Sequence, residues 1–204
     1  MDERPNSPLL LAPEQVEALR QLAVLGGADA ARSLGRLLGT TVEAAQPRAL
    51  VAAKGGIAKA LQPDGTAFAV HFTVEGGARF RWLLHLTREG ATLMGGLLLG
   101  RPVVEPVEKA SVVYTSALAE AANIIVSSYV GGVGAGAGLT LVPSVPHVMV
   151  GLLADAVEAA FADLDDTVLL ATDLRLPGVR FAGRIVVAPE EESLGRLLAG
   201  VGAR

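Results

Sequence analysis

The hydrophobic and polar positions between residues 114 and 131 repeat with the period of an α-helix. On one side the apolar residues recur at intervals of four, three and four: Leu118, Ala122, Ile125 and Tyr129. Ser116, Glu120 and Asn123 recur in the same manner on the opposite side, within about 60° of one another. The pattern therefore predicts a helix that buries its apolar stripe and holds a hydroxyl, a carboxylate and a carboxamide toward solvent.

The rest of the chain alternates between helical runs and short strands that can pair as hairpins. Further helices are expected at residues 13–25, 28–38 and 91–99, and from Pro189 to Leu198. Strands are expected at residues 41–45, 50–53, 66–74, 79–86, 139–142, 147–152, 167–174 and 179–187. Residues 154–161 fit either kind of element. Helices mixed with hairpins predict an α+β fold, in which an antiparallel sheet has helices packed on one face.

The second half of the sequence repeats the layout of the first. A shift of 99 residues aligns four first-half residues with the polar helix face and a later proline: Glu17, Gln21, Val24 and Pro47 fall opposite Ser116, Glu120, Asn123 and Pro146. A shift of 101 aligns Gly77-Ala-Arg79-Phe80 with Gly178-Val-Arg180-Phe181. Solenoid repeats are about 20 to 50 residues long, so a period near 100 indicates a duplicated half-domain. We expect one pseudo-two-fold domain over residues 1–204, with half-repeats at about 14–100 and 113–200.

The polar helix face and the later proline form the pattern Ser-x3-Glu-x2-Asn-x22-Pro, from Ser116 to Pro146. This pattern resembles the signature of the CheC/CheX/FliY family of chemotaxis phosphatases, which opens with Asp or Ser. CheC-type proteins contain two pseudo-symmetric halves, each with a candidate site. The internal repeat therefore makes the resemblance closest to CheC.

The resemblance implies a phosphatase that hydrolyses the aspartyl phosphate of a CheY-like response regulator in chemotaxis signalling. The receiver domain of such a partner supplies the phosphorylated aspartate, a bound Mg²⁺ and a lysine near the phosphoryl oxygens. By resemblance, Asn123 orients the attacking water and Glu120 engages the lysine of the partner. Ser116 lies at the rim of the contact, and Pro146 shapes the loop beside it. The chain itself is expected to bind no cofactor and no metal.

The first half is expected to carry a degenerate site. Gln21 stands where the pattern has glutamate, and Val24 stands where it has asparagine. An isopropyl group neither donates nor accepts a hydrogen bond, so Val24 cannot orient a water. Glu17 and Pro47 belong to the same eroded site, which leaves one active site. An alternative is a non-catalytic CheC-like adaptor that binds CheD, the receptor deamidase, or a flagellar switch component.

Composition and the placement of the histidines argue against several classes of partner and of site. The net charge is −4, the pI is about 5.4 and the basic residues form no run, which argues against a nucleic-acid partner. The chain has no cysteine, so disulfides, thiol nucleophiles and Cys-ligated zinc are excluded. The histidines lie in apolar strand patterns and are too dispersed for a metal site: His71, His85 and His147.

One uncharged stretch, residues 121–154, is long enough to span a membrane. It contains serines, five glycines between residues 131 and 138 and two prolines, so a buried helix, a turn and a strand explain it better. Residues 132–137 resemble a dinucleotide fingerprint, but a helix precedes them and a strand follows. Their glycines are expected to bring a helix close to the sheet. Residues 1–15 lack the basic start and long apolar core of a signal peptide, and we expect a cytoplasmic protein without membrane insertion.

Overall fold

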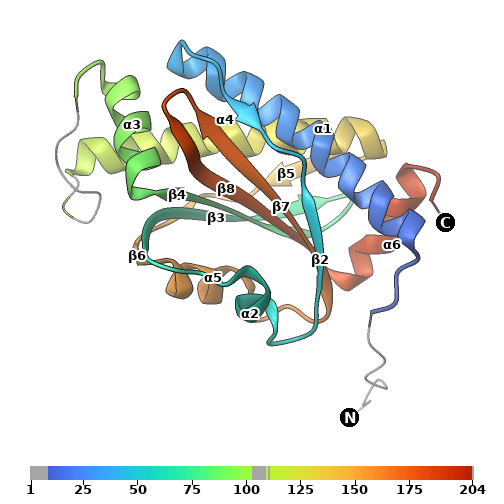
Figure 1. The fold of residues 1–204 in the computed structure, drawn as a ribbon. Coiled ribbons are helices and arrows are strands. Elements are labelled where there is room, and N and C mark those ends of the chain that lie inside the picture. Colours follow the sequence, from blue (N-terminus) through green and yellow to red (C-terminus); the bar gives the residue numbers. More distant parts are fainter. Residues whose placement is uncertain (1–8, 103–108, 110, 204) are drawn as a thin grey trace.

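The structure of the protein is a computed structural model that describes residues 9–102, 109 and 111–203. Residues 1–8, which belong to the N-terminal stretch considered for a signal peptide, lie outside this part. The first half forms α1 (Pro13–Leu38), β1 (Glu43–Ala44), β2 (Arg48–Ala52), α2 (Ile57–Leu61), β3 (Thr66–Gly76), β4 (Phe80–Thr87) and α3 (Arg88–Leu99). The second half repeats this order (Figure 1) with α4 (Val112–Ala137), β5 (Leu141–Pro143), β6 (His147–Leu152), α5 (Leu153–Phe161), β7 (Thr167–Leu176), β8 (Val179–Pro189) and α6 (Glu191–Gly200).

The described strands join one antiparallel sheet. Its order is β1-β7-β8-β4-β3-β5, with β2 following β1 along β7 and β6 following β5 along β3. The short strands of each half therefore pair with the long hairpin of the other half. Either hairpin without these partners would expose an unpaired strand edge. The two halves consequently form one interlocked unit.

The sheet is symmetric about the two strands at its centre. β4 and β8 are antiparallel neighbours, and Leu84 pairs with Ile185, 101 residues later. On the far side of each, Leu84 pairs with Val70 of β3 and Ile185 pairs with Thr172 of β7. A pseudo-two-fold axis between Leu84 and Ile185 thus exchanges Val70 with Thr172. The α1 and α4 helices both have 26 residues. The α+β, internally duplicated fold expected from the sequence is confirmed.

Apolar side chains cover both faces of the sheet. Along β3, Phe68 and Val70 belong to the core beneath α1 and α4, whereas Ala67 and Ala69 belong to the core beneath α5, as the two-residue period of a strand requires. α3 and α6 complete the first face, and α2 lies with α5 on the second (Figure 1). The prediction of helices on a single face is wrong. The hydrophobic pattern gives no sign of α2 and leaves residues 154–161 undecided, and both segments form helices.

α1 is one continuous helix, not the two predicted at residues 13–25 and 28–38. Gly26 lies where α1 crosses α4, and a Cβ atom there would be 2.9 Å from the carbonyl oxygen of Tyr129. Glycine at this position therefore lets the two helix backbones approach closely. The close packing offsets the cost of a glycine inside a helix, which is about 1 kcal/mol relative to alanine.

The glycine-rich residues 132–137 form the last turns of α4. A Cβ atom on Gly132 would lie 3.0 Å from the carbonyl oxygen of Leu25 in α1. Gly132 therefore serves the packing of one helix on another, whereas Gly134 lies against Leu139 and Leu141 at the start of β5, where the helix approaches the sheet as predicted. The uncharged stretch 121–154 comprises most of α4 together with β5 and β6, which confirms the interpretation as helix, turn and strand. No helix in the described residues combines the length and hydropathy that a membrane span requires.

Candidate functional site

The polar motif residues of the second half lie on the solvent side of α4. The helix begins after Ser111, whose hydroxyl accepts a hydrogen bond from the Tyr114 backbone N–H at 3.3 Å and so caps the first turn. Ser116 and Glu120 are exposed, and Asn123 is half-buried. The opposite stripe is buried in the main core: Leu118, Ala122, Ile125 and Tyr129. A hydroxyl, a carboxylate and a carboxamide therefore share one strip of about two helical turns.

The three polar side chains are not engaged within the molecule. Across residues 9–102, 109 and 111–203, the side chains of Ser116, Glu120 and Asn123 make no hydrogen bond and no ion pair. A free carboxylate accepts hydrogen bonds, and a free carboxamide both donates and accepts them. The α4 strip is therefore able to bind polar groups of a second molecule.

Pro146 lies in the segment between β5 and β6, which returns along α4. Leu141 begins β5 beside the end of the helix, with its Cδ1 atom 3.7 Å from the position of a Cβ on Gly134. On either side of Pro146, Ser144 donates its backbone N–H to the carbonyl oxygen of Thr73 in β3, and His147 pairs with His71 of the same strand.

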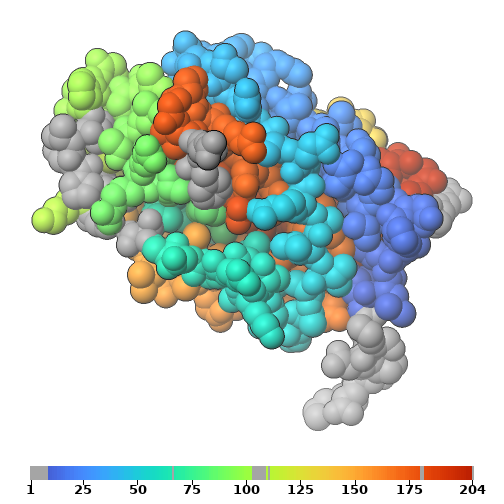
Figure 2. Space-filling model, viewed as in Figure 1, coloured from blue at the N-terminus to red at the C-terminus, as the bar shows by residue number. Residues whose placement is uncertain are grey.

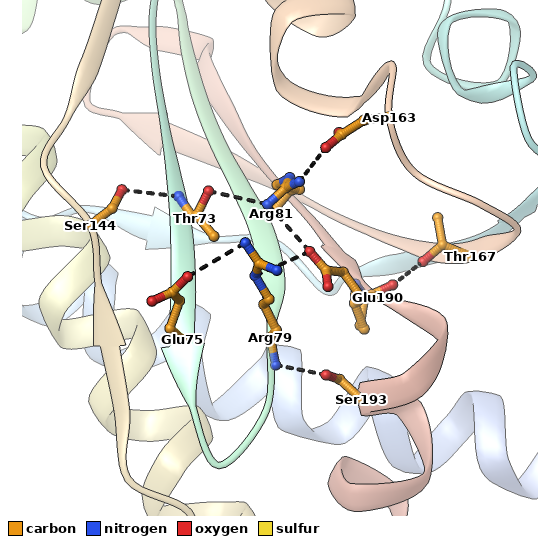
Figure 3. Close-up of polar contacts among 10 residues, drawn as sticks. Thr73, Glu75, Arg79, Arg81, Ser144, Asp163, Thr167, Glu190 and Ser193 are labelled. Atoms are coloured by element: carbon orange, nitrogen blue, oxygen red, sulfur yellow. Dashed lines mark hydrogen bonds and ion pairs between the residues drawn. The ribbon is translucent and has the colours of Figure 1, made fainter.

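A polar cluster anchors this segment to the sheet, as Figure 3 shows. The Ser144 N–H donates to the carbonyl oxygen of Thr73 at 2.8 Å, and the Ser144 hydroxyl accepts from the Thr73 N–H at 3.1 Å. The Thr73 hydroxyl accepts from Arg81 at 3.2 Å. Arg81 also pairs with Asp163 at 2.5 Å and with Glu190 at 3.3 Å. This cluster ties the segment before β6 to the loop before β7 and to the start of α6. Sequence reasoning missed it, because folding brings its members together from four distant parts of the chain.

The four first-half residues also lie together, on α1 and the segment that follows it. Glu17 and Gln21 are exposed, and the Gln21 amide donates to the Glu17 carboxylate at 2.6 Å. Val24 and Pro47 line one groove between α1 and residues 42–47. The structure thus groups the residues that the 99-residue shift selects.

Arg20 makes the first-half face chemically different from the second. Its guanidinium donates to the two oxygens of the Glu17 carboxylate at 2.5 and 2.6 Å. Hydrogen bonds from Arg20 and then from Gln21 lower the pKa of Glu17 to about 2. The 99-residue shift places Ala119 opposite Arg20, so the residue directly before Glu120 carries no guanidinium. Sequence reasoning missed this contact, although the three-residue spacing of Glu17 and Arg20 on a helix was the available signal.

Two of the three histidines are neighbours in space, although they are 76 residues apart in the sequence. His71 and His147 pair across β3 and β6, and their rings stack with centroids 4.8 Å apart. Burial lowers the pKa of His71, as do the nearby His147 and Arg81 to a smaller extent. His85 is buried elsewhere in the sheet, and this burial lowers its pKa to about 4. No group of three His, Cys, Asp or Glu side chains in the described residues could hold a metal ion.

Known proteins match this chain in structure, whereas the comparisons of sequence find no match. No family model and no curated protein matches the sequence. FliY of Thermotoga maritima superposes with a TM-score of 0.78 at 17% identity, covering 96% of this chain and 100% of that chain. CheX of Desulfovibrio desulfuricans gives 0.58 at 12% identity, covering 83% and 99%. The FliM middle domain of H. pylori gives 0.64 at 11% identity, covering 93% and 99%.

The superpositions establish the fold of this chain, but at identities below 20% they do not establish that it shares the activity of these proteins. A closer relationship to CheC than to FliY, CheX or FliM stays a prediction. The interlocked sheet, the duplicated halves and the α1–α4 pair together place this chain in the CheC/CheX/FliY-type fold.

Proposed function

We propose that the protein is a phosphatase that hydrolyses the aspartyl phosphate of a CheY-like receiver domain in chemotaxis signalling. The observation that carries the proposal is the Glu120 and Asn123 pair, one turn apart on the solvent side of α4 and unengaged within the described residues. The pattern around them resembles the signature of chemotaxis phosphatases. The surrounding fold is that of FliY and of the chemotaxis protein CheX.

In the proposed reaction a water oxygen attacks the phosphorus atom, and the bond between phosphorus and the aspartyl oxygen breaks. The products are a free carboxylate on the receiver and inorganic phosphate. The receiver supplies the Mg²⁺ and the lysine that balance the phosphoryl charge. Asn123 holds the water in line through its carboxamide, and Glu120 binds the lysine and sets the docking register. Ordering one water contributes about 2–4 kcal/mol, or about 30- to 1000-fold in rate.

The direct test uses receiver domains encoded in the same genome, each phosphorylated with a small-molecule phosphodonor. The loss of aspartyl phosphate is followed with and without the protein, after the excess donor is removed. We expect the protein to accelerate the loss for at least one receiver at substoichiometric concentration. Equal decay with and without protein for every receiver would exclude the phosphatase function.

We expect the first-half helix face to be dispensable for turnover. The Glu17→Ala and Gln21→Ala double variant removes only exposed side chains, whose loss typically changes stability by less than about 0.5 kcal/mol. Receiver dephosphorylation should therefore stay within about twofold of the unaltered protein. A loss as large as that of an Asn123→Ala variant would show that the first-half face takes part in the reaction.

Phosphatase activity can be restored to the first half if its backbone still matches that of the second half and only its side chains differ. Gln21→Glu with Val24→Asn recreates a carboxylate and a carboxamide one turn apart, and Arg20→Ala removes the guanidinium that would neutralise the new carboxylate. In an Asn123→Ala background, we expect this triple change to recover part of the receiver dephosphorylation. A folded triple variant without recovered activity would mean that the first-half face no longer docks a receiver.

An adaptor function is the second candidate, favoured by the similarity to FliM. Solved structures with this fold include a complex of FliG with FliM from H. pylori, and the first half of this chain has Gln21 and Val24 where the pattern has glutamate and asparagine. An adaptor would bind CheD or a switch component through this fold and would leave phosphorylated receivers unchanged. Stoichiometric binding of such a partner, together with no acceleration in the receiver assay, would favour the adaptor.

A further inference from the structure

A pocket with a volume of about 200 Å³ lies on the second face of the sheet, between α5 and the turn that follows α2. Figure 2 shows the α2 segment, coloured teal, at the surface of the molecule, and Figure 1 shows α2 and α5 on the same side of the sheet. A cavity of about 150 Å³ can hold benzene, and pockets for drug-sized ligands have about 300 Å³ or more. This pocket therefore admits a molecule between these sizes.

The floor of the pocket lies at the pseudo-two-fold axis and has a polar half and an apolar half. His85 of β4 pairs with Arg184 of β8, and beside them Leu83 pairs with Val186. The axis exchanges His85 with Val186 and Arg184 with Leu83, since the members of each pair are 101 residues apart. Apolar side chains thus fit the equivalent positions, and burying a polar group costs stability unless it is paired. The sheet itself does not require the two polar side chains.

The polar half of the floor suits a carboxylate. His85 is 7% exposed and the Arg184 side chain 21%, so a ligand in the pocket can reach both. Arg184 donates to Asp173 at 2.5 Å, and Arg48 pairs with the same carboxylate at 3.6 Å, so positive charge is in excess among these three groups. Burial and, to a smaller extent, Arg184 lower the pKa of His85 to about 4. The imidazole is therefore neutral at pH 7 and carries one N–H donor beside the guanidinium.

The walls of the pocket add one carboxylate and apolar surface. Asp64 and the polar Gln62 line the pocket from the turn after α2, and both are exposed. The apolar walls come from the same turn and from the start of α5: Leu61, Pro63 and Leu153. A simple anion would be repelled by Asp64 and a simple cation by Arg184. An aliphatic α-amino acid, in contrast, matches both charges and the apolar walls.

We propose that this pocket binds a free aliphatic α-amino acid of the size of valine or leucine. The carboxylate of the ligand binds Arg184 and His85, and its ammonium group binds Asp64. Its side chain packs against Leu61 and Leu153. The pocket lies on the face of the sheet opposite α1 and α4. Binding in it is therefore independent of the polar strip of α4 and of the proposed phosphatase function.

The test is isothermal titration calorimetry of the full chain with ligands built on the leucine skeleton. L-Leucine carries both charged groups, 4-methylpentanoate lacks the ammonium group and 3-methylbutylamine lacks the carboxylate. We expect L-leucine to bind and the other two to bind at least about tenfold more weakly, because each loses charge-assisted hydrogen bonds. If neither L-leucine nor L-valine binds, the proposal is overturned. Equal affinity for 4-methylpentanoate would overturn the assignment to an amino acid.

Substitutions then locate the binding site. Asp64→Asn removes the charge of an exposed side chain and should weaken leucine binding at least about tenfold, without weakening the binding of 4-methylpentanoate. Asp155→Asn makes the same change at an exposed residue of α5 outside the pocket lining and should leave leucine binding unchanged. His85→Val introduces the side chain of the symmetric position, so we expect a folded protein, verified by thermal unfolding, with leucine affinity at least about tenfold lower. Undiminished binding in Asp64→Asn or in folded His85→Val would overturn the pocket as the binding site.

Discussion

Replacing Asn123 with alanine is expected to lower the rate of receiver dephosphorylation by about 30- to 1000-fold, because the variant cannot hold the attacking water in line. The fold should be unaffected. Asn123 makes no side-chain hydrogen bond within the described residues, and alanine is the better helix former by several tenths of a kcal/mol. Single-turnover decay of the phosphorylated receiver measures the rate, and thermal unfolding measures the stability.

Ser127→Ala is the matched control for this experiment. Ser127 is exposed one turn after Asn123 on the same helix, and the motif gives it no role, so its replacement should leave the rate unchanged. Glu120→Ala should weaken the affinity for the receiver as well as the rate, because the carboxylate is proposed to bind the partner. Full activity in the Asn123→Ala protein would rule out the water-positioning mechanism.

Gly26→Ala is expected to destabilise the protein by about 1–3 kcal/mol, because the added methyl group overpacks the crossing of α1 and α4. The Cβ atom would lie 2.9 Å from the Tyr129 carbonyl oxygen and 2.9 Å from Cγ2 of Val133. A backbone oxygen cannot move aside without displacing the helix that holds it. In a chain of this length each kcal/mol lowers the melting temperature by about 2–4 °C, so calorimetry or a circular dichroism melt resolves the effect.

Gly131→Ala provides the comparison, since it makes the same chemical change in the other helix of the pair. A Cβ on Gly131 meets no atom within 4 Å. Alanine should therefore raise the stability by up to about 1 kcal/mol through its better helix propensity. Equal stability of the two variants would contradict the close backbone contact between α1 and α4.

The helical face of the candidate site could be predicted because the information is local. Ser116, Glu120 and Asn123 repeat with the period of a helix. The residues on the opposite side are buried as that period requires: Leu118, Ala122, Ile125 and Tyr129. The long hairpins β3–β4 and β7–β8 were predicted for the same reason, since alternating apolar residues flank turn-forming glycines. The duplication was visible because both halves keep the same spacing of elements.

Neighbours from distant parts of the chain could not be predicted in this way. The sequence does not show that β1 and β2 pair with β7 of the other half, because the register between remote strands depends on the assembled sheet. The stacking of His71 on His147 depends in the same way on the register of β3 with β6. The continuity of α1 through Gly26 is also a tertiary effect, because the local preference of glycine to end a helix is outweighed by packing against α4.

The sequence by itself determined the class of fold, its duplication and the polar strip of α4, because each rests on periodicity within one element or on spacing repeated along the chain. The tertiary structure decided that Glu17 is bound by Arg20 while Glu120 is unengaged within the described residues. It also decided that α1 and residues 42–47 border a groove. These features depend on which side chains meet in space. Two halves with the same layout of elements thus present different surfaces, because the side chains on their outer helices differ.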